Sequence, residues 1–350
     1  MTRTLFLSIP LLVALWTMGC GPAITLRMLE PAAETVPPHV ETVALVDRSR
    51  PAHAGEGALG VLEGLFTGEA IGVDTEGRAR ALEGLGAGLN NSPRFRVVRT
   101  ITSRDEVESS LFDEGLSWGA ATELCAAIGC QGIVALEAFD SDSHMDTSVE
   151  REKYKDDEGN WHSKAVHKAQ RTTRVLAAWR LYDVEGQQVV DDLRDHTVDN
   201  TWTGNGDSES EARGKLPSQY DTVSELAWDS GEYYAARIAP TWVLVRRAYF
   251  ASGDDRLKEA KIYVKADNWE AARGLWLSAS EEPDAKVRGK AEFNLALAAE
   301  REGFLGRAVE WARLAAEHFP KPKTRNYLYT LESRVVAQDV LREQLEGAPE

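Results

Sequence analysis

The sequence predicts an α+β protein. Its N-terminal α/β domain has a mixed sheet and a long antiparallel hairpin, and an all-α domain of helical repeats follows. Three observations predict this. Short apolar strand patterns alternate with helical patterns over residues 40–140, which is typical of an α/β sheet. Residues 173–202 alternate apolar and polar side chains around a turn, as a hairpin does. From residue 251 onward the apolar spacing is helical throughout, with a period close to 3.6 residues.

Residues 1–19 predict a secretory signal peptide. Arg3 precedes an apolar run from Leu5 to Trp16, which is shorter than the roughly 20 residues that a membrane-spanning helix needs. The junction at Cys20 resembles the lipobox of bacterial lipoproteins, although Thr17 stands where that pattern usually has Leu. The resemblance implies cleavage before Cys20 and acylation of its thiol, so membrane lipid is an expected partner. An ordinary secreted protein is the alternative.

The residues after Cys20 bear on the location of the protein. Gly21 and Pro22 follow the cysteine. In enterobacterial lipoproteins an Asp at that position retains the protein at the inner membrane, so the resemblance implies the periplasmic face of the outer membrane. Residues 20–39 contain four prolines and little periodicity. We expect them to form an extended, lipidated tether.

The α/β domain is expected to span residues 40–250. Gly84, Gly86 and Gly88 fall inside one of its helical patterns and therefore predict close helix packing, not a nucleotide-binding loop. The pattern predicts these elements in order: a strand over 40–46, a helix over 74–89, a strand over 95–98, a helix starting at Ser103, a helix capped by Ser117, a strand over 133–139, the hairpin over 173–202, a flexible loop over 203–219, a helix over 221–238 and a strand over 241–250.

The second domain, residues 251–350, contains an internal repeat of 36 residues. Small and aromatic residues recur at this spacing, with Ala260, Ala272, Trp276 and Ala279 matched by Ala296, Ala308, Ala312 and Ala315. The pattern resembles tetratricopeptide repeats, whose small residues let paired helices approach closely. About two units are visible, followed by a helix over 323–345. Because such arrays usually need about three units, we expect this domain to lean on the first.

Several segments together resemble a family of uncharacterised bacterial envelope lipoproteins with tetratricopeptide-like C-terminal halves. The first domain is also loosely similar to the α/β module of the curli-secretion-channel lipoproteins and of the TolB N-terminus. These resemblances imply a location and an architecture, not a reaction. The segments that carry the family resemblance are residues 67–74, 93–95, 132–137, 179–183, 236–242 and 293–300.

The net charge of the chain and the absence of two catalytic motifs argue against a nucleic-acid-binding protein and against an enzyme. Removal of residues 1–19 takes away one charge, that of Arg3, and leaves a net charge of −17. Such a surface repels phosphate backbones, so we expect no nucleic-acid partner. The sequence has no Gly-x-Ser-x-Gly or His-Glu-x-x-His motif, so neither an enzyme nor a cofactor is predicted. Most aromatic residues of the second half sit at helical or strand spacing, which favours a core role over a ligand-binding surface.

Cys125 and Cys130 are the cysteines that remain beside Cys20. They lie five residues apart at the predicted end of a helix. An oxidising periplasm would allow a small loop-closing disulfide, whereas buried thiols that act as small hydrophobic groups are the alternative. Both interpretations stay open at this stage, because the spacing alone does not fix the geometry.

Asp140, Asp142, His144 and Asp146 form the clearest metal-binding pattern. On an extended strand these alternate residues project from one face and offer carboxylate oxygens and an imidazole. They do not form an EF-hand, because Met145 and Arg151 stand where that loop needs Gly and Glu. The alternative is the solvated polar end of a strand.

The sequence therefore predicts a non-enzymatic envelope lipoprotein. Stacked helix pairs create concave surfaces, so the helical repeats are expected to bind an unidentified envelope protein or to stabilise an assembly. The alternative is an envelope receptor that binds a small ligand or glycan in a cleft between the two domains.

Overall fold

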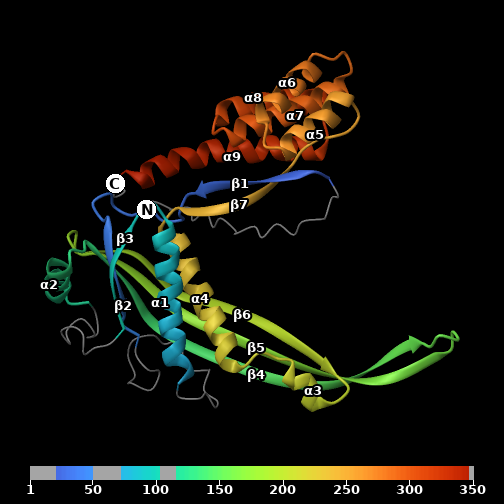
Figure 1. Cartoon of the computed structure of the whole chain (residues 1–350). Helices are drawn as coiled ribbons and strands as arrows, with labels where there is room; N and C mark the ends of the chain where they lie inside the picture. The colour runs from blue at the N-terminus through green and yellow to red at the C-terminus, as the bar shows by residue number, and fades with distance from the viewer. Residues whose placement is uncertain (1–20, 50–71, 103–115, 347–350) are drawn as a thin grey trace, which may run out of the picture. The chain divides into compact units, whose positions relative to one another are not determined.

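The computed structural model describes residues 21–49, 72–102 and 116–346 (Figure 1). The chain divides into two compact units. The sheet unit comprises residues 28–243 together with the C-terminal segment from Ala337. The helical unit comprises residues 244–336 together with the N-terminal segment up to Arg27. The predicted fold class is confirmed: a mixed α/β sheet with a long hairpin precedes an all-helical region.

The sheet unit is built on a sheet with the strand order β3-β2-β4-β5-β6. β2 runs parallel to both of its neighbours, whereas β4, β5 and β6 are antiparallel. β4 and β5 form a hairpin that pairs from Gly132 with Asp183 to Lys155 with Trp161. The strands are β2 (Thr42–Asp47), β3 (Arg96–Ile101), β4 (Gly132–Lys155), β5 (Trp161–Asp183) and β6 (Gln188–Gly206).

Helices cover the two faces of this sheet, and the alternation of side chains along β2 shows how. Val43 and Leu45 belong to a core shared with α1 (Val73–Asn91) and α4 (Gln219–Ile238). Ala44 and Val46 point to the other face and pack with α2 (Trp118–Ile128). β2 is therefore buried on both faces, as central parallel strands usually are.

Two local predictions about these helices are confirmed. The side chain of Ser117 accepts a hydrogen bond from the backbone N–H of Ala120 and caps α2. Gly84 and Gly88 bring α1 close to α4, because an added Cβ would overlap the backbone of Trp228 or the side chain of Ala235. Gly86 instead lies in ordinary contact distance of the sheet, so two of the three glycines mark the α1–α4 contact.

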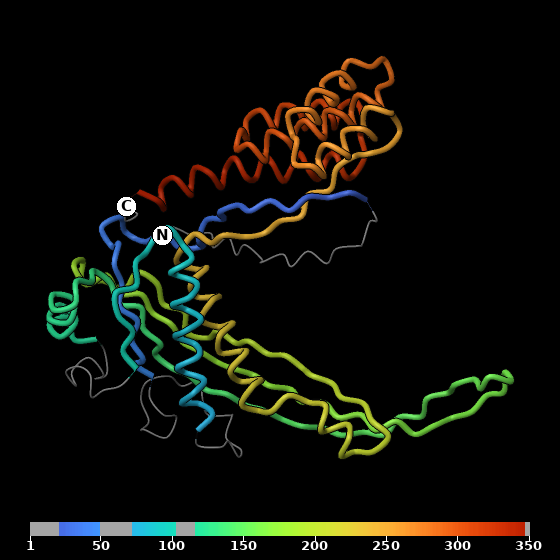
Figure 2. Tube along the Cα trace, viewed as in Figure 1, coloured from blue at the N-terminus to red at the C-terminus, as the bar shows by residue number. Residues whose placement is uncertain are grey.

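The polar segment after residue 139 differs from the prediction. β4 continues to Lys155, and β5 starts at Trp161, so these two strands form a second long hairpin that the apolar pattern did not predict. The predicted hairpin over 173–202 corresponds to parts of β5 and β6. The last pair between β5 and β6 joins His167 to Gly206, and the residue opposite His167 on β4 is Val149. Residues 150–166, called the arm from here on, therefore extend past the end of β6 as a ribbon of β4 and β5 (Figure 2).

The expected flexible loop over 203–219 is also different in the structure. β6 runs on to Gly206, and a short helix, α3 (Glu209–Gly214), follows. Ser208 caps α3 by accepting a hydrogen bond from the N–H of Glu211. The run of Ser and Glu residues that suggested a loop thus supplies a cap and an acidic first turn, both of which favour a helix start.

The predicted tether is wrong for residues 23–30. They form β1 (Ala23–Glu30), which pairs with β7 (Thr241–Ala248). Leu26 and Met28 are buried alternate residues of β1, a period of two that the flanking prolines masked.

The C-terminal end of α9 contacts the segment after β1. Gln344 accepts a hydrogen bond from the N–H of Ala32 and donates one to the carbonyl oxygen of Ala32. The C-terminal residues thus belong to the sheet unit.

Helix pairs form the helical unit. Within the described residues it contains α5 (Asp255–Lys265), α6 (Trp269–Ser280), α7 (Ala285–Arg301), α8 (Leu305–His318) and most of α9 (Pro322–Leu345). Every position of the predicted 36-residue repeat is at most 1% exposed: Ala260, Ala272, Trp276, Ala279, Ala296, Ala308, Ala312 and Ala315. The repeat therefore marks the surfaces where successive helices pack.

Candidate functional site

Residues 1–20, including the predicted lipidation site Cys20, lie outside the described residues. Among the helices that the structure describes, none is both long and apolar enough to span a bilayer. Acylation of Cys20 stays a prediction from the sequence.

Cys125 and Cys130 form a disulfide, with their Cα atoms 4.4 Å apart. Gly129 makes this geometry accessible, because it ends α2 in the left-handed conformation, with φ of 77°, where Gly is strongly favoured. The N–H groups of Gly129 and Cys130 both donate to the carbonyl oxygen of Cys125. The structure thus selects the disulfide from the two alternatives that the sequence left open.

The predicted metal residues lie along β4 but do not gather around one point. A strand advances about 3.3 Å per residue, so alternate side chains are spread along it. Asp140 is buried, whereas His144 and Asp146 are exposed and contact each other at 3.0 Å. In the described part of the chain no group of three or more His, Cys, Asp or Glu side chains is placed to hold a metal ion. The geometry does not support this metal site.

Asp140 is nevertheless in an unusual environment. Burial raises its pKa to about 6, and the negative charges of Asp74 and Asp142 add to the effect. Asp74 lies in the first turn of α1 and accepts a hydrogen bond of 2.6 Å from the hydroxyl of Ser141. The hydrogen bond from Ser141 therefore joins β4 to the start of α1, and the carboxylates around it disfavour a further negative charge at this point.

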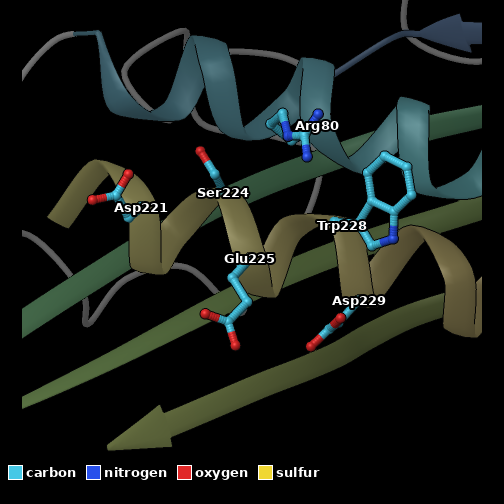
Figure 3. A pocket seen from close by; sticks show the side chains of 6 residues that line it. All are labelled: Arg80, Asp221, Ser224, Glu225, Trp228 and Asp229. Carbon is cyan, nitrogen blue, oxygen red and sulfur yellow. The ribbon is translucent and has the colours of Figure 1, made fainter. Parts of the chain in front are cut away.

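A shallow hollow of about 410 Å³ lies between α1 and α4 (Figure 3). The guanidinium of Arg80 lies 4.9 Å from the centre of the Trp228 ring, in a cation–π contact, and Arg80 also pairs with Glu83. The remaining lining residues come from α4 and are mostly acidic: Asp221, Ser224, Glu225 and Asp229. Neither a nucleophile with an adjacent base nor a set of donors for an oxyanion is present among these residues. The hollow gives no basis for catalysis.

The arm ends in exposed aromatic side chains. Trp161 is 67% exposed and Tyr154 is 47% exposed. The ammonium of Lys155 lies 5.0 Å from the centre of the Trp161 ring. The rings of Tyr154 and His162 stack with their centres 5.6 Å apart. Apolar side chains that are exposed together on a surface often mark an interaction site.

The turn at the end of the arm is ordered by its own hydrogen bonds. Asp156 accepts from the N–H groups of Glu158 and Asn160 and lies 2.6 Å from the ring of His162. The bond to His162 is the main cause that lowers the pKa of Asp156. Gly159, with φ of 87°, completes the turn. The arm therefore presents its aromatic side chains on a preorganised turn, which reduces the entropy lost on binding.

Comparison with known families agrees with the division into a sheet-containing and a helical part. A family model described as Domain of unknown function (DUF8603) matches residues 40–250, more than half of the chain. The chain belongs to the DUF8603 family. A second family model, Domain of unknown function (DUF6340), matches residues 258–333 in the helical region. No curated protein matches the chain. The DUF8603 region contains the sheet, the disulfide and the arm.

The apolar pattern of the sequence does not predict the arm, because a ribbon that is exposed on both faces lacks an apolar stripe. Its β4 half, Glu150 to Lys155, carries mostly polar residues and shows no alternation of apolar and polar side chains. One local signal was available, since residues 156–160 read Asp-Asp-Glu-Gly-Asn and predict a turn. Tyr154 and Trp161 flank that turn, and their cross-strand position follows once the turn is taken as the end of a hairpin.

Proposed function

We propose that this protein is a non-enzymatic interaction module of the cell envelope, anchored to lipid through Cys20, that binds a partner protein with its arm. The observation that carries the proposal is the ordered arm with Tyr154 and Trp161 exposed at its end. Tyr and Trp are enriched among the residues that contribute most to protein–protein binding.

The geometry of the arm supports a protein partner over a small ligand. A ribbon of two strands has little hydrophobic core of its own, and isolated hairpins are marginally stable in water. Its unpaired edges also offer backbone N–H and C=O groups to a further strand. A partner that packs on the aromatic residues and pairs with an edge would stabilise the arm. The Cys125–Cys130 disulfide agrees with a compartment outside the cytoplasm.

The location of the protein is also part of our proposal. The signal peptide, Cys20 and the resemblance to envelope lipoproteins favour the periplasmic face of the outer membrane. Two or more acyl chains hold a protein at a membrane stably. The arm would then act from a fixed membrane position, as an adaptor or assembly scaffold does.

Crosslinking of native membranes tests the proposal. Single variants Trp161→Ala and Tyr154→Ala should each reduce recovery of the crosslinked partner by about tenfold or more, the effect of losing a central aromatic contact. Tyr329→Ala is the matched control, because Tyr329 is a 73% exposed aromatic residue on α9. Equal recovery with all three variants would refute a role for the arm.

A further inference from the structure

The sheet formed by β1 and β7 starts close to the predicted lipid anchor (Figure 1). Pro22 follows Cys20 by two residues, and a chain spans at most about 3.6 Å per residue, so the two residues lie within about 7 Å of each other. The N–H of Tyr249, the residue after β7, donates a 3.0 Å hydrogen bond to the carbonyl oxygen of Pro22, the residue before β1. The two strands are therefore antiparallel, and an acylated Cys20 would hold the start of β1 and the end of β7 at the membrane surface.

One side of each strand is more exposed than the other. Successive side chains of a strand point to opposite sides. In β1 the buried residues Leu26 and Met28 alternate with exposed residues, and in β7 half-buried positions alternate with exposed ones. Because Pro22 lies opposite Tyr249, the exposed sets of the two strands fall on the same side of the sheet. We call this side the outer face, and its residues are Thr25, Arg27, Trp242, Leu244 and Arg246.

The outer face combines two large apolar side chains with two arginines. Leu244 is 74% exposed and Trp242 is 37% exposed. Arg27 and Arg246 add two positive charges, and none of the five residues is acidic, although the chain as a whole has a formal net charge of −16. Trp is enriched at membrane interfaces, and the arginine side chain can bury its methylene groups while its charged end stays among polar groups. The composition is thus that of a surface facing lipid headgroups.

A sheet held by a lipid at one end either stands upright or lies flat on the bilayer. Each strand has eight residues, which span about 26 Å at 3.3 Å per residue. An upright sheet would leave Leu244 and Trp242 in water. A flat sheet would bury both side chains at the level of the headgroups and bring the arginines to the lipid phosphates. Apolar burial and attraction to anionic lipid both favour the flat orientation.

We propose that the outer face is a membrane-docking surface that lies flat on an anionic bilayer. The proposal rests on the proposed lipid anchor at Cys20 and adds a second contact, made by the protein itself. Trp242 and Leu244 enter the interfacial layer, and Arg27 and Arg246 pair with lipid phosphates. A docked sheet has one orientation at the membrane, whereas acyl chains alone leave the protein free to rotate.

A fluorophore on the outer face tests the proposal with the mature, acylated protein. Leu244→Cys supplies a single free thiol, because Cys20 is acylated and Cys125 is bonded to Cys130. An environment-sensitive fluorophore on this thiol should shift its emission to shorter wavelength on vesicles of phosphatidylethanolamine and phosphatidylglycerol. Doxyl-labelled lipid in the same vesicles should quench it. Tyr329→Cys is the matched control, because Tyr329 is 73% exposed on α9, and its fluorophore should not respond.

Flotation of the same vesicles separates failure of the docking surface from failure of the anchor. Protein that floats with the vesicles while the fluorophore at position 244 stays unquenched keeps its anchor and overturns the docking surface. Equal quenching at positions 244 and 329 would also overturn it, because the contact would not be specific to the outer face. Protein that does not float lacks the lipid anchor, and the docking proposal falls with it.

The arginines are tested in the Leu244→Cys protein. Adding Arg246→Gln should shift the equilibrium between docked and undocked sheet about fivefold towards the undocked form, the contribution of one basic residue near an anionic surface. The shift is measured as loss of quenching. Adding Arg325→Gln, which removes an exposed arginine of α9, should leave the quenching unchanged. Equal effects of the two substitutions would overturn the role of the arginines in docking.

Discussion

Tyr327 of α9 donates a 2.6 Å hydrogen bond to the buried carboxylate of Glu300 on α7. The same carboxylate accepts hydrogen bonds from Arg334 of α9 and from Arg247 of β7. Burial and the negative charge of Glu300 raise the pKa of Tyr327 well above 10. One side chain thus joins the last strand, the central helix and the final helix of the helical unit.

Replacing Glu300 by alanine should destabilise the helical unit by about 3–5 kcal/mol, because it leaves partly buried arginines and a buried hydroxyl without their acceptor. Glu310→Ala removes an exposed carboxylate of α8 and should have almost no effect. Urea unfolding followed by tryptophan fluorescence measures both variants. Similar stabilities for the two would show that the contacts of Glu300 contribute little.

The α1–α4 contact should respond to a single methyl group. An added Cβ at Gly231 of α4 would overlap the carbonyl oxygen of Ala81 on α1, so Gly231→Ala should cost about 1–3 kcal/mol. Gly274 in α6 has open space around it, and Gly274→Ala should stabilise the protein by about 0.5–1 kcal/mol. Thermal unfolding shows whether each variant is less or more stable than the unchanged protein. A neutral Gly231→Ala would mean that the helices separate easily.

Asp140 should make the stability of the sheet unit depend on pH. Its pKa is raised from 3.8 to about 6 in the folded chain, so the folded state binds this proton more tightly than the unfolded state. The stabilisation from the protonated carboxyl is complete below about pH 4 and is lost as the pH rises through about 6. Asp140→Asn should therefore raise Tm at pH 7 by about 2 °C or more and flatten the profile between pH 4 and 6. Asp146→Asn, on the exposed part of β4, is the control, and matching profiles for the two variants would contradict the effect.

Loss of the Cys125–Cys130 disulfide should lower the free energy of unfolding by about 2 kcal/mol, from the loop entropy of a closed segment of this size. The double variant Cys125→Ala/Cys130→Ala and the reduced protein should behave alike in denaturant titrations. If a reductant also changed the stability of the double variant, the loss of stability on reduction could not be assigned to the Cys125–Cys130 disulfide.

The sequence predicted those parts of the fold that bury an apolar face. The helix capped by Ser117 and the repeat that places Trp276 and Ala312 in equivalent buried positions followed from spacing alone. Such patterns are readable because one side of each element faces a core.

The features that the sequence did not reveal were hidden for different reasons. β1 was hidden because prolines surround Leu26 and Met28, although none lies within the strand. The arm is solvated on both faces, and its β4 half holds Glu150 to Lys155, which resemble a loop. The side chain of Asn294 accepts a hydrogen bond from Phe250, which lies 44 residues earlier in the chain, and no local spacing reveals this contact. Of the candidate site, the sequence pointed to the cysteine pair, and only the structure revealed the arm. The anchor at Cys20 stays a prediction, because it lies outside the described residues.

Site-specific photocrosslinking tests the central claim most directly. A benzophenone amino acid in place of Trp161 lies at the exposed end of the arm, whereas the same group in place of Tyr329 lies on α9. Irradiation of intact cells should give one discrete, higher-mass adduct from position 161 and none of that mass from position 329. An adduct from position 329 alone would contradict binding through the arm. The absence of an adduct from either position, with both variants present at the membrane, would contradict it as well.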